Sequence, residues 1–360
     1  MLFSSTREHW SRSSRDLIGP KRCGDHCYPR RMAADTVLAI KGLALDARIR
    51  RTTAQPVADA HIEVRAGEIV GLVGESGSGK TLTALSALRL LPDNIEIAAG
   101  RIEVGGQDVR ALDEAGLAAL RGSVVGMVFQ DPIGSLNPSM TIGRQVAEVV
   151  RIHQQTDRAA ADARAIEALG LVGFPQARER FDAYPHQLSG GLRQRVMIAM
   201  AIANEPRLVI ADEPTTALDV TVQAQILELL QSLVAELGIG VLLITHDLGV
   251  IANAADRVTV MYGGRTVEQC STLEAFGDMR HPYTEALVAS APTLEGSEEL
   301  VLRGIPGTPP DPMRPEPGCP FAPRCARALP DCVTAPPVFT AIGEGRALAC
   351  INPVPAAVRV

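Results

Sequence analysis

The sequence predicts an α/β protein in which a sheet with parallel strands is flanked by helices. Short apolar segments alternate with helical stretches between residues 36 and 268, as in strands joined by crossover helices. Four of these segments lead directly into glycine or polar residues, namely residues 69–73, 124–129, 208–211 and 241–245. Continuous apolar runs are typical of buried parallel strands, and ligands bind beyond the carboxyl ends of such strands. We therefore expect the functional residues at that edge of the sheet.

The composition supports a globular protein and excludes several other classes. The 360 residues suffice for about two domains, and 46% apolar with 21% charged residues is ordinary globular usage. A net charge of −6 provides no basic excess for binding a nucleic-acid backbone. There is no apolar run of about 18 residues and no secretory signal, so we expect a cytosolic chain with reduced thiols.

Changes in composition divide the chain into three parts. Residues 1–32 are rich in Arg and Ser without apolar periodicity, and we interpret them as a disordered leader or an over-extended start. Residues 33–268 carry the alternating pattern, and residues 269–360 form a C-terminal extension. An alternative for the leader is a metal site formed by Cys23, His26 and Cys27.

A glycine-rich motif follows the first of the four strands and predicts a phosphate-binding loop. It matches G-x-x-x-x-G-K-[ST] and consists of Gly74, Glu75, Ser76, Gly77, Ser78, Gly79, Lys80 and Thr81. The glycines let backbone amides surround phosphate oxygens, Lys80 supplies a cation, and Thr81 offers its hydroxyl to Mg²⁺. A helical run at residues 82–91 adds the aligned donors and the dipole of a helix N-terminus.

Two acidic residues at the end of strand 208–211 predict the other half of a hydrolytic site. Asp212 can reach the metal shell, and Glu213 can orient or deprotonate the attacking water. An apolar strand that ends in two acids is common, so the pair is informative only beside a phosphate loop. Together the two motifs predict hydrolysis of a nucleotide phosphate with Mg²⁺.

Further motifs in the same order make the sequence resemble the ATP-binding subunits of ABC transporters. Leu188-Ser189-Gly190-Gly191-Leu192-Arg193-Gln194-Arg195 is similar to the signature motif of that family, and Ala217-Leu218-Asp219 is similar to its D-loop. Gln130 resembles the Q-loop glutamine, and His246 resembles the switch histidine. The resemblance implies a P-loop NTPase fold of the ABC type, with a RecA-like core, an antiparallel β subdomain and a helical subdomain at about residues 131–205.

The resemblance also implies an ATPase in which two ATP molecules lie between two subunits. The residues expected to hold Mg²⁺ are Thr81, Gln130 and Asp212. Those expected in catalysis are Glu213, His246 at the γ-phosphate, and Gln130. Those expected to contact the partner's nucleotide in trans are Ser189, Gly190, Gly191 and Asp219.

The sequence departs from the family at the position of the aromatic residue that stacks on adenine. Ala47 occupies this position, where a stacked aromatic would contribute roughly 1–3 kcal/mol. Arg48 or Arg50 could stack on the base instead. The departure predicts little discrimination between ATP and GTP.

The resemblance narrows to the branch that imports dipeptides, oligopeptides and nickel. The residues that carry it include Phe129-Gln130-Asp131-Pro132, Tyr184-Pro185-His186-Gln187, His281-Pro282-Tyr283-Thr284 and Gly318-Cys319-Pro320-Phe321-Ala322-Pro323-Arg324-Cys325. The branch implies uptake of peptides, or of solutes such as nickel complexes, through two permeases supplied by an extracytoplasmic solute-binding protein. It also implies a peripheral position on the cytoplasmic face of the inner membrane. Two paralogous ATPase subunits pair as a heterodimer in this branch, and this chain resembles the first of them.

Two other functions stay open for an ABC-type ATPase. A soluble ATPase that acts on nucleic acid or ribosomes commonly carries two ATPase units or large inserted arms, whereas this chain has one unit and no coiled-coil insertion. A regulatory ATPase without transport is compatible with the missing aromatic at Ala47. We expect the importer, with no direct nucleic-acid partner.

Four cysteines lie in the C-terminal extension, namely Cys319, Cys325, Cys332 and Cys350. Their spacing, C-x₅-C-x₆-C-x₁₇-C, identifies no particular metal. Eleven prolines between residues 306 and 337 exclude a helical or central-sheet domain, which leaves the segment little to order it except a cross-linking metal. Since some members of the resembled branch carry an iron–sulfur cluster here, the alternatives are a [4Fe–4S] cluster, Zn²⁺ or unligated thiols.

Overall fold

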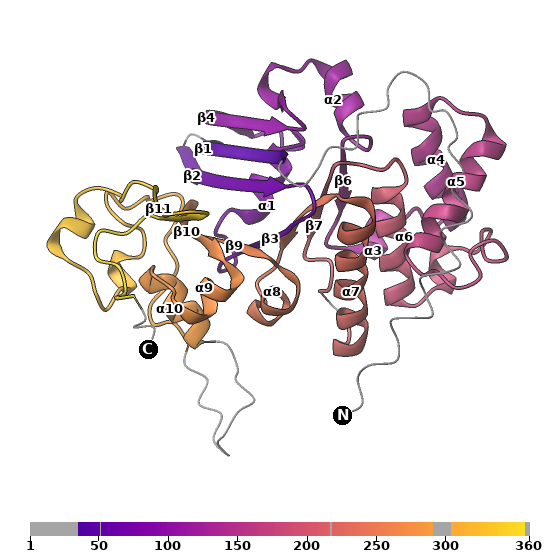
Figure 1. Ribbon diagram of the computed structural model, residues 1–360. Coiled ribbons are helices and arrows are strands. Elements are labelled where there is room, and N and C mark those ends of the chain that lie inside the picture. Colours follow the sequence, from indigo (N-terminus) through magenta and orange to yellow (C-terminus); the bar gives the residue numbers. More distant parts are fainter. Residues whose placement is uncertain (1–34, 51, 217, 291–303, 357–360) are drawn as a thin grey trace, which may run out of the picture. The chain divides into compact units, whose positions relative to one another are not determined.

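A mixed sheet runs through the part of the chain that the structure describes. The computed structural model describes residues 35–50, 52–216, 218–290 and 304–356, so Cys23, His26 and Cys27 lie outside it. The strand order is β5-β4-β1-β2-β10-β9-β3-β8-β7-β6 (Figure 1). The strands are β1 (Thr36–Ile49), β2 (Thr52–Arg65), β3 (Ile69–Val73), β4 (Ile95–Val104), β5 (Gln107–Asp108), β6 (Val125–Val128), β7 (Leu208–Asp212), β8 (Gly240–Ile244), β9 (Arg257–Tyr262) and β10 (Arg265–Ser271).

The sheet has an antiparallel part and a parallel part, as expected from the sequence. Strand β1 pairs antiparallel with β2 and β4. Strand β3 lies between β8 and β9 and is parallel to both, and β7 joins β8 to β6 in the same direction. Every residue of β3, β7 and β8 is buried, which explains why these strands are continuous apolar runs.

Alternate residues of the central strands pack into two hydrophobic cores on opposite faces of the sheet. Ile69 and Val73 of β3 belong to one core, and Val70 and Leu72 belong to the other. The sheet is therefore covered on both sides, and only its edges and strand ends are available for ligands.

Ten α-helices are found in the described residues. They are α1 (Lys80–Ser86), α2 (Glu114–Leu120), α3 (Pro132–Ser135), α4 (Ile142–Gln154), α5 (Arg158–Leu171), α6 (Gly190–Ile202), α7 (Val220–Leu237), α8 (Leu248–Ala254), α9 (Thr272–Gly277) and α10 (Pro282–Ala289). Helices α3 to α6 lie between β6 and β7 in the chain, within the residues where the helical subdomain is expected. Figure 1 shows α4, α5 and α6 grouped together, away from the C-terminal extension drawn in yellow.

The helix after the phosphate loop is shorter than the predicted run 82–91. Helix α1 ends at Ser86, and the next residues continue as turns in which the Leu90 amide donates to Leu85 O. Arg89 then takes a left-handed conformation with φ 47°, and Pro92 follows. A left-handed residue breaks the helical repeat, so the helix ends before the apolar periodicity of the sequence does.

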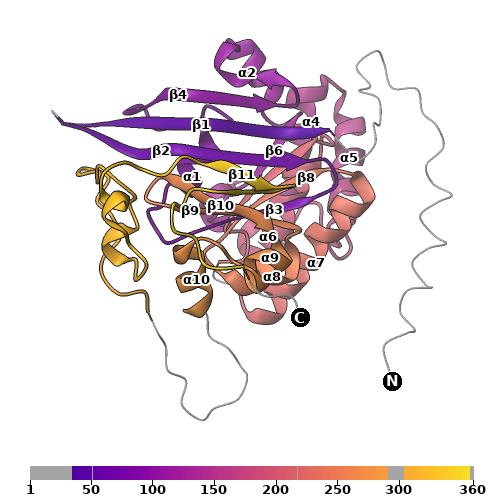
Figure 2. The same ribbon diagram turned by 60° about the vertical axis from the view of Figure 1, so that its left-hand side comes forward.

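The C-terminal extension contributes a small hairpin to the sheet. Its strands are β11 (Thr340–Gly343) and β12 (Arg346–Leu348), and β12 pairs antiparallel with β10. The two views place this yellow segment beside β10 (Figures 1 and 2). In the described residues, the proline-rich part contains only the 3₁₀ turns η3 (Ala322–Arg324) and η4 (Pro330–Val333), in agreement with the exclusion of longer helices.

Protein contacts order this extension, whereas the sequence suggested that it has little to order it except a cross-linking metal. Phe321 is 2% exposed and belongs to one of the two main cores. Arg346 is buried among the carboxylates of Glu268, Glu274 and Asp278. The sequence argument failed because it treated the segment in isolation, whereas docking onto β10 and its neighbours supplies the missing burial.

No helix in the described part of the chain is both long and apolar enough to span a bilayer.

Candidate nucleotide-binding site

The predicted phosphate loop connects β3 to α1 in a conformation that only glycine can provide. Gly74, Gly77 and Gly79 have φ values of 153°, 79° and 96°. A Cβ on Gly74 would lie 2.1 Å from the Met261 carbonyl oxygen at the end of β9, and one on Gly79 would lie 2.9 Å from the Pro56 carbonyl oxygen of β2. The loop therefore passes between two strands with no room for side chains at these positions.

Lys80 begins α1 and folds back over the loop. Its Nζ donates to the carbonyl oxygens of Gly74 at 2.8 Å and Glu75 at 3.0 Å. Burial lowers the pKa of Lys80, against the opposing effect of the Glu213 and Asp212 carboxylates. The ammonium thus has only neutral acceptors as hydrogen-bond partners, which phosphate oxygens can replace.

Thr81 and Asp212 meet at the carboxyl edge of the sheet, as the sequence predicts for two Mg²⁺ ligands. The Thr81 hydroxyl donates to Asp212 Oδ1 at 3.2 Å, across 131 residues of sequence. Burial raises the pKa of Asp212, and the Thr81 hydrogen bond partly opposes this effect. A hydroxyl and a carboxylate oxygen are the kinds of donor that Mg²⁺ binds.

Three side chains converge on the carboxylate of Glu213. Gln130 Nε2 donates to Glu213 Oε2 at 2.9 Å, and the Thr216 hydroxyl donates to the same oxygen at 2.9 Å. His246 Nδ1 lies 3.0 Å from Glu213 Oε1. The structure therefore brings together Gln130, Glu213 and His246, which the sequence singled out separately.

Burial and the surrounding polar groups shift the pKa of Glu213 in opposite directions. Burial by itself would raise the pKa of Glu213, but the bonds to His246 and Thr216 outweigh it, so the pKa is lowered. Glu213 is consequently a carboxylate at neutral pH and can accept a hydrogen bond from water. Its backbone has a positive φ of 47°, an uncommon conformation for a glutamate.

The residues expected to act in trans lie at two helix N-termini. The Ser189 hydroxyl caps α6 by accepting from Leu192 N at 3.4 Å, and Asp219 caps α7 by accepting from Val222 N at 2.9 Å. A Cβ on Gly191 would lie 2.6 Å from Val222 Cγ1, so the two helix starts pack closely. Ser189, Gly190 and Asp219 are exposed, and Ala217 lies outside the described residues.

Ala47, at the position of the expected aromatic, is 5% exposed and lies in β1 opposite Ala54 of β2 and Ile95 of β4. Arg48 forms an exposed ion pair with Glu96 at 2.9 Å. Weak discrimination between ATP and GTP stays a prediction.

Sequence reasoning missed two groups at this site. Thr216 lies three residues after Glu213, and a hydroxyl at that spacing is a signal that could have identified it. Arg324 forms an ion pair with Glu75 of the phosphate loop at 2.7 Å, although 249 residues separate them. Nothing in the spacing of the sequence indicated this second contact.

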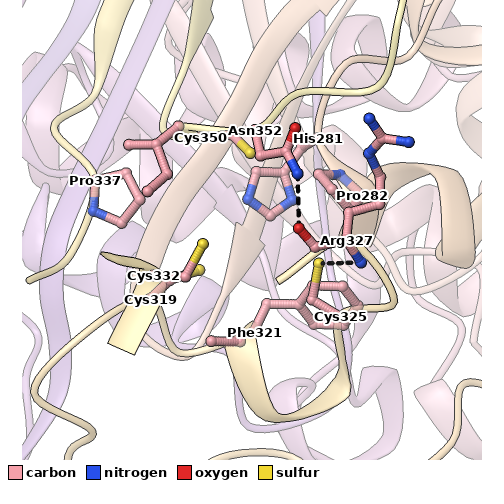
Figure 3. A pocket seen from close by; sticks show the side chains of 12 residues that line it. His281, Pro282, Cys319, Phe321, Cys325, Arg327, Cys332, Pro337, Cys350 and Asn352 are labelled. Carbon is pink, nitrogen blue, oxygen red and sulfur yellow. Dashed lines mark hydrogen bonds between the residues drawn. The ribbon is translucent and has the colours of Figure 1, made fainter. Parts of the chain in front are cut away.

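The four cysteines of the extension line one cavity of about 20 Å³, together with His281 (Figure 3). Burial raises the pKa of Cys319 and Cys325, and raises that of Cys350 to about 11. Burial also lowers the pKa of His281 to about 3, so its ring is neutral. Within the described residues, no three His, Cys, Asp or Glu side chains are arranged to hold a metal ion.

The fold and these contacts define the class of the protein, which is a P-loop ATPase of the ABC type. A sequence model described as ABC transporter matches residues 57–216, and one described as the C-terminal region of oligopeptide/dipeptide transporters matches residues 267–332. The chain is similar to a putative peptide import ATP-binding protein of Brucella ovis, with 47% identity over 332 residues that cover 89% of this chain and 98% of the relative. It is also similar to the oligopeptide transport ATP-binding protein OppD of Mycobacterium tuberculosis, with 45% identity over 88% of this chain and 52% of that protein.

Solved structures agree with these sequence matches. The dimeric ATP-binding cassette MJ0796 bound to ADP and phosphate has a TM-score of 0.59 at 26% identity, covering 65% of this chain and 98% of that chain. The structure of cbiO1 of Clostridium perfringens has a TM-score of 0.59 at 27% identity, and the match covers 67% of this chain and 91% of that chain. The chain belongs to the ATP-binding subunits of oligopeptide/dipeptide ABC transporters and hydrolyses ATP to drive transport. Permeases and a binding protein are the general partners of such a subunit.

Proposed function

We propose that the chain drives uptake of di- or oligopeptides by hydrolysing ATP at a site completed by a second ATPase subunit. The observation that carries this proposal is the convergence of Gln130, Thr216 and His246 on Glu213. The names of the Brucella and Mycobacterium relatives support peptides as the cargo. Nickel complexes are the alternative cargo of the same branch.

Each residue at the edge of the sheet has a role in this proposal. Lys80 exchanges the Gly74 and Glu75 carbonyl oxygens for phosphate oxygens, and the loop amides surround the phosphate. Thr81, Asp212 and Gln130 would hold Mg²⁺, which would supply positive charge against the charge that develops on the phosphate. Glu213 orients the attacking water and takes its proton, while His246 steadies the γ-phosphate.

The exposed groups at the starts of α6 and α7 serve the nucleotide of the partner subunit. Ser189, Gly190, Gly191 and Asp219 contribute helix N-terminal donors and a carboxylate to that interface. The dimeric form of the similar cassette MJ0796 supports this arrangement. We propose that the partner is the paralogous ATPase, so that the motor is a heterodimer.

The permease contact falls beside the Q-loop. Phe129 and Ile133 are exposed, Ile133 by 70%, on either side of Gln130. An apolar side chain of this size on a surface indicates a contact when it lies next to others. We propose that residues 130–140 meet the permease at the cytoplasmic face of the membrane, where the subunit is peripheral. We also propose that the chain consists of a leader or over-extended start at 1–32, the ATPase at 33–268 and the extension at 269–360.

Peptide-stimulated ATP hydrolysis is the test of this function. The full chain is reconstituted in proteoliposomes with the paralogous ATPase and the two permeases, and hydrolysis is measured with the cognate binding protein. We expect peptide-loaded binding protein to raise the rate above that with the unloaded protein. Stimulation by nucleic acid or ribosomes without permeases would contradict the proposal and favour the soluble ATPase.

We also propose that Cys319, Cys325, Cys332 and Cys350 hold a [4Fe–4S] cluster. The proposal is supported by the four cysteines lining one cavity, because each thiolate of such a cluster binds a different iron and the four sulfurs need not converge on one point. Zn²⁺ requires that convergence, and the described residues lack it. When bound, the cluster would cross-link η3, η4 and the residues after β12, and its formation would require the buried thiols to lose their protons.

Anaerobic purification followed by iron analysis and absorbance measurement tests the cluster. We expect iron and visible absorbance in the wild-type chain and in Cys270→Ser, whose buried thiol lies in β10 outside the cavity. Cys332→Ser should lose both. A folded, colourless and metal-free wild-type chain would contradict the proposal, and zinc without iron would favour the alternative.

A further inference from the structure

Glu75 of the phosphate loop is held from three directions. Its carbonyl oxygen accepts from Lys80 Nζ at 3.0 Å, and its amide donates to the Tyr283 hydroxyl at 2.8 Å. Its carboxylate accepts two hydrogen bonds from Arg324 of the extension. The side chain is therefore fixed on the same loop that is proposed to surround the phosphates of ATP.

Arg324 is built into this position with every nitrogen engaged. Its Nη1 and Nη2 donate to Glu75 Oε2 at 2.7 Å and Oε1 at 3.0 Å, a fork-like pair that only a guanidinium can form. The remaining bonds run to the Tyr262 hydroxyl and to the carbonyl oxygens of Ile305 and Pro306. The Arg324 side chain is 5% exposed and the Glu75 side chain 22%, so solvent reaches the carboxylate more than the guanidinium.

An aromatic cluster joins the C-terminal extension to β9 and α10. Tyr262 ends β9, Tyr283 lies in α10, and Phe321 precedes η3, with ring centroids 4.4 to 5.4 Å apart. Arg324 lies over the Tyr262 ring at 5.7 Å. Because aromatics make up only 3% of the chain, their concentration here fixes the extension tightly beside the loop.

We propose that Arg324 is a positioning residue for ATP binding: it neutralises the Glu75 carboxylate and holds it in place beside the phosphate-binding loop. The inference rests on the proposed role of that loop. A triphosphate that approaches the loop meets the negative charge of Glu75, and the buried guanidinium cancels this charge. Without Arg324, the carboxylate would be unpaired and would repel the incoming phosphates. The C-terminal extension is thus part of the ATP site and not only an appendage.

The test measures the Kd for ATP and kcat of full-length variants, at a temperature well below the Tm of each. Arg324→Gln should raise the Kd about tenfold, because the unpaired Glu75 carboxylate repels the phosphates, while kcat at saturating ATP stays within about threefold. Arg324→Lys keeps the charge but loses the fork-like pair, so its Kd should lie between those of the wild type and Arg324→Gln. In the double variant Glu75→Gln/Arg324→Gln the repelling charge is gone, and the Kd should return to within about threefold of the wild type.

Arg346→Gln is the matched control, because Arg346 is another buried arginine of the extension but binds Glu268, Glu274 and Asp278 away from the loop. It should lower the Tm and leave the Kd for ATP unchanged. A wild-type Kd in Arg324→Gln, or an equal loss of affinity in the single and double variants, would overturn the inference. If the wild-type chain itself bound no ATP, the proposed role of the loop would fail instead.

Discussion

Replacement of Glu213 by glutamine is expected to lower kcat for ATP hydrolysis by about 10²- to 10⁴-fold, the usual contribution of a general base. Glutamine has nearly the same shape as glutamate, so the Gln130 and Thr216 contacts have an acceptor oxygen in the variant. What is lost is the anionic oxygen that can orient water and take its proton. The Kd for ATP should consequently stay within about threefold of the wild-type value.

Single-turnover hydrolysis and equilibrium binding measured on the same preparations separate these two effects. The matched control is Glu228→Gln, because Glu228 is exposed on α7 and has no part in the site. This control should hydrolyse ATP at the wild-type rate. If Glu213→Gln retained more than about a tenth of wild-type turnover, Glu213 would not be the base and its role would be structural.

The second large effect is expected on binding. Lys80→Met should raise the Kd for ATP by about 10- to 100-fold, because a charge-assisted hydrogen bond to phosphate is worth about 1.5–3 kcal/mol. Lys80 is 7% exposed, and its stem packs where Met, of similar length, can also pack. The loss should therefore appear in affinity more than in the stability of the fold.

Titration with ATP and thermal unfolding together test this expectation. Lys41→Met is the control, because Lys41 is exposed on β1 and makes no contact with the loop. Its Kd for ATP should match that of the wild type. Equal affinity in Lys80→Met and the wild type would show that the ammonium does not bind the phosphates, and a large fall in Tm would show a structural role instead.

Local sequence patterns predicted the central strands well. Strand β3 has the predicted bounds 69–73, β7 differs from the predicted segment by one residue at one end, and β6 and β8 differ by one residue at each end. The reason is that β3, β7 and β8 are buried along their whole length, which favours a nearly continuous apolar run in each. The end of α1 was predicted less well, because Arg89 ends the helix by its backbone conformation and its residue type gives no sign of it.

The phosphate loop, the acidic pair and the family were determined by the sequence alone, since each depends on residues that are close in the chain or fixed in order. The tertiary structure decided which of these residues touch. Gln130 and Glu213 are 83 residues apart, and the Arg324–Glu75 pair spans 249. Parallel strands end at one edge, which brings the residues that follow them together whatever their separation in sequence. The order of the extension has the same origin: its burial comes from docking onto β10, α10 and the phosphate loop, and no segment read by itself contains that information.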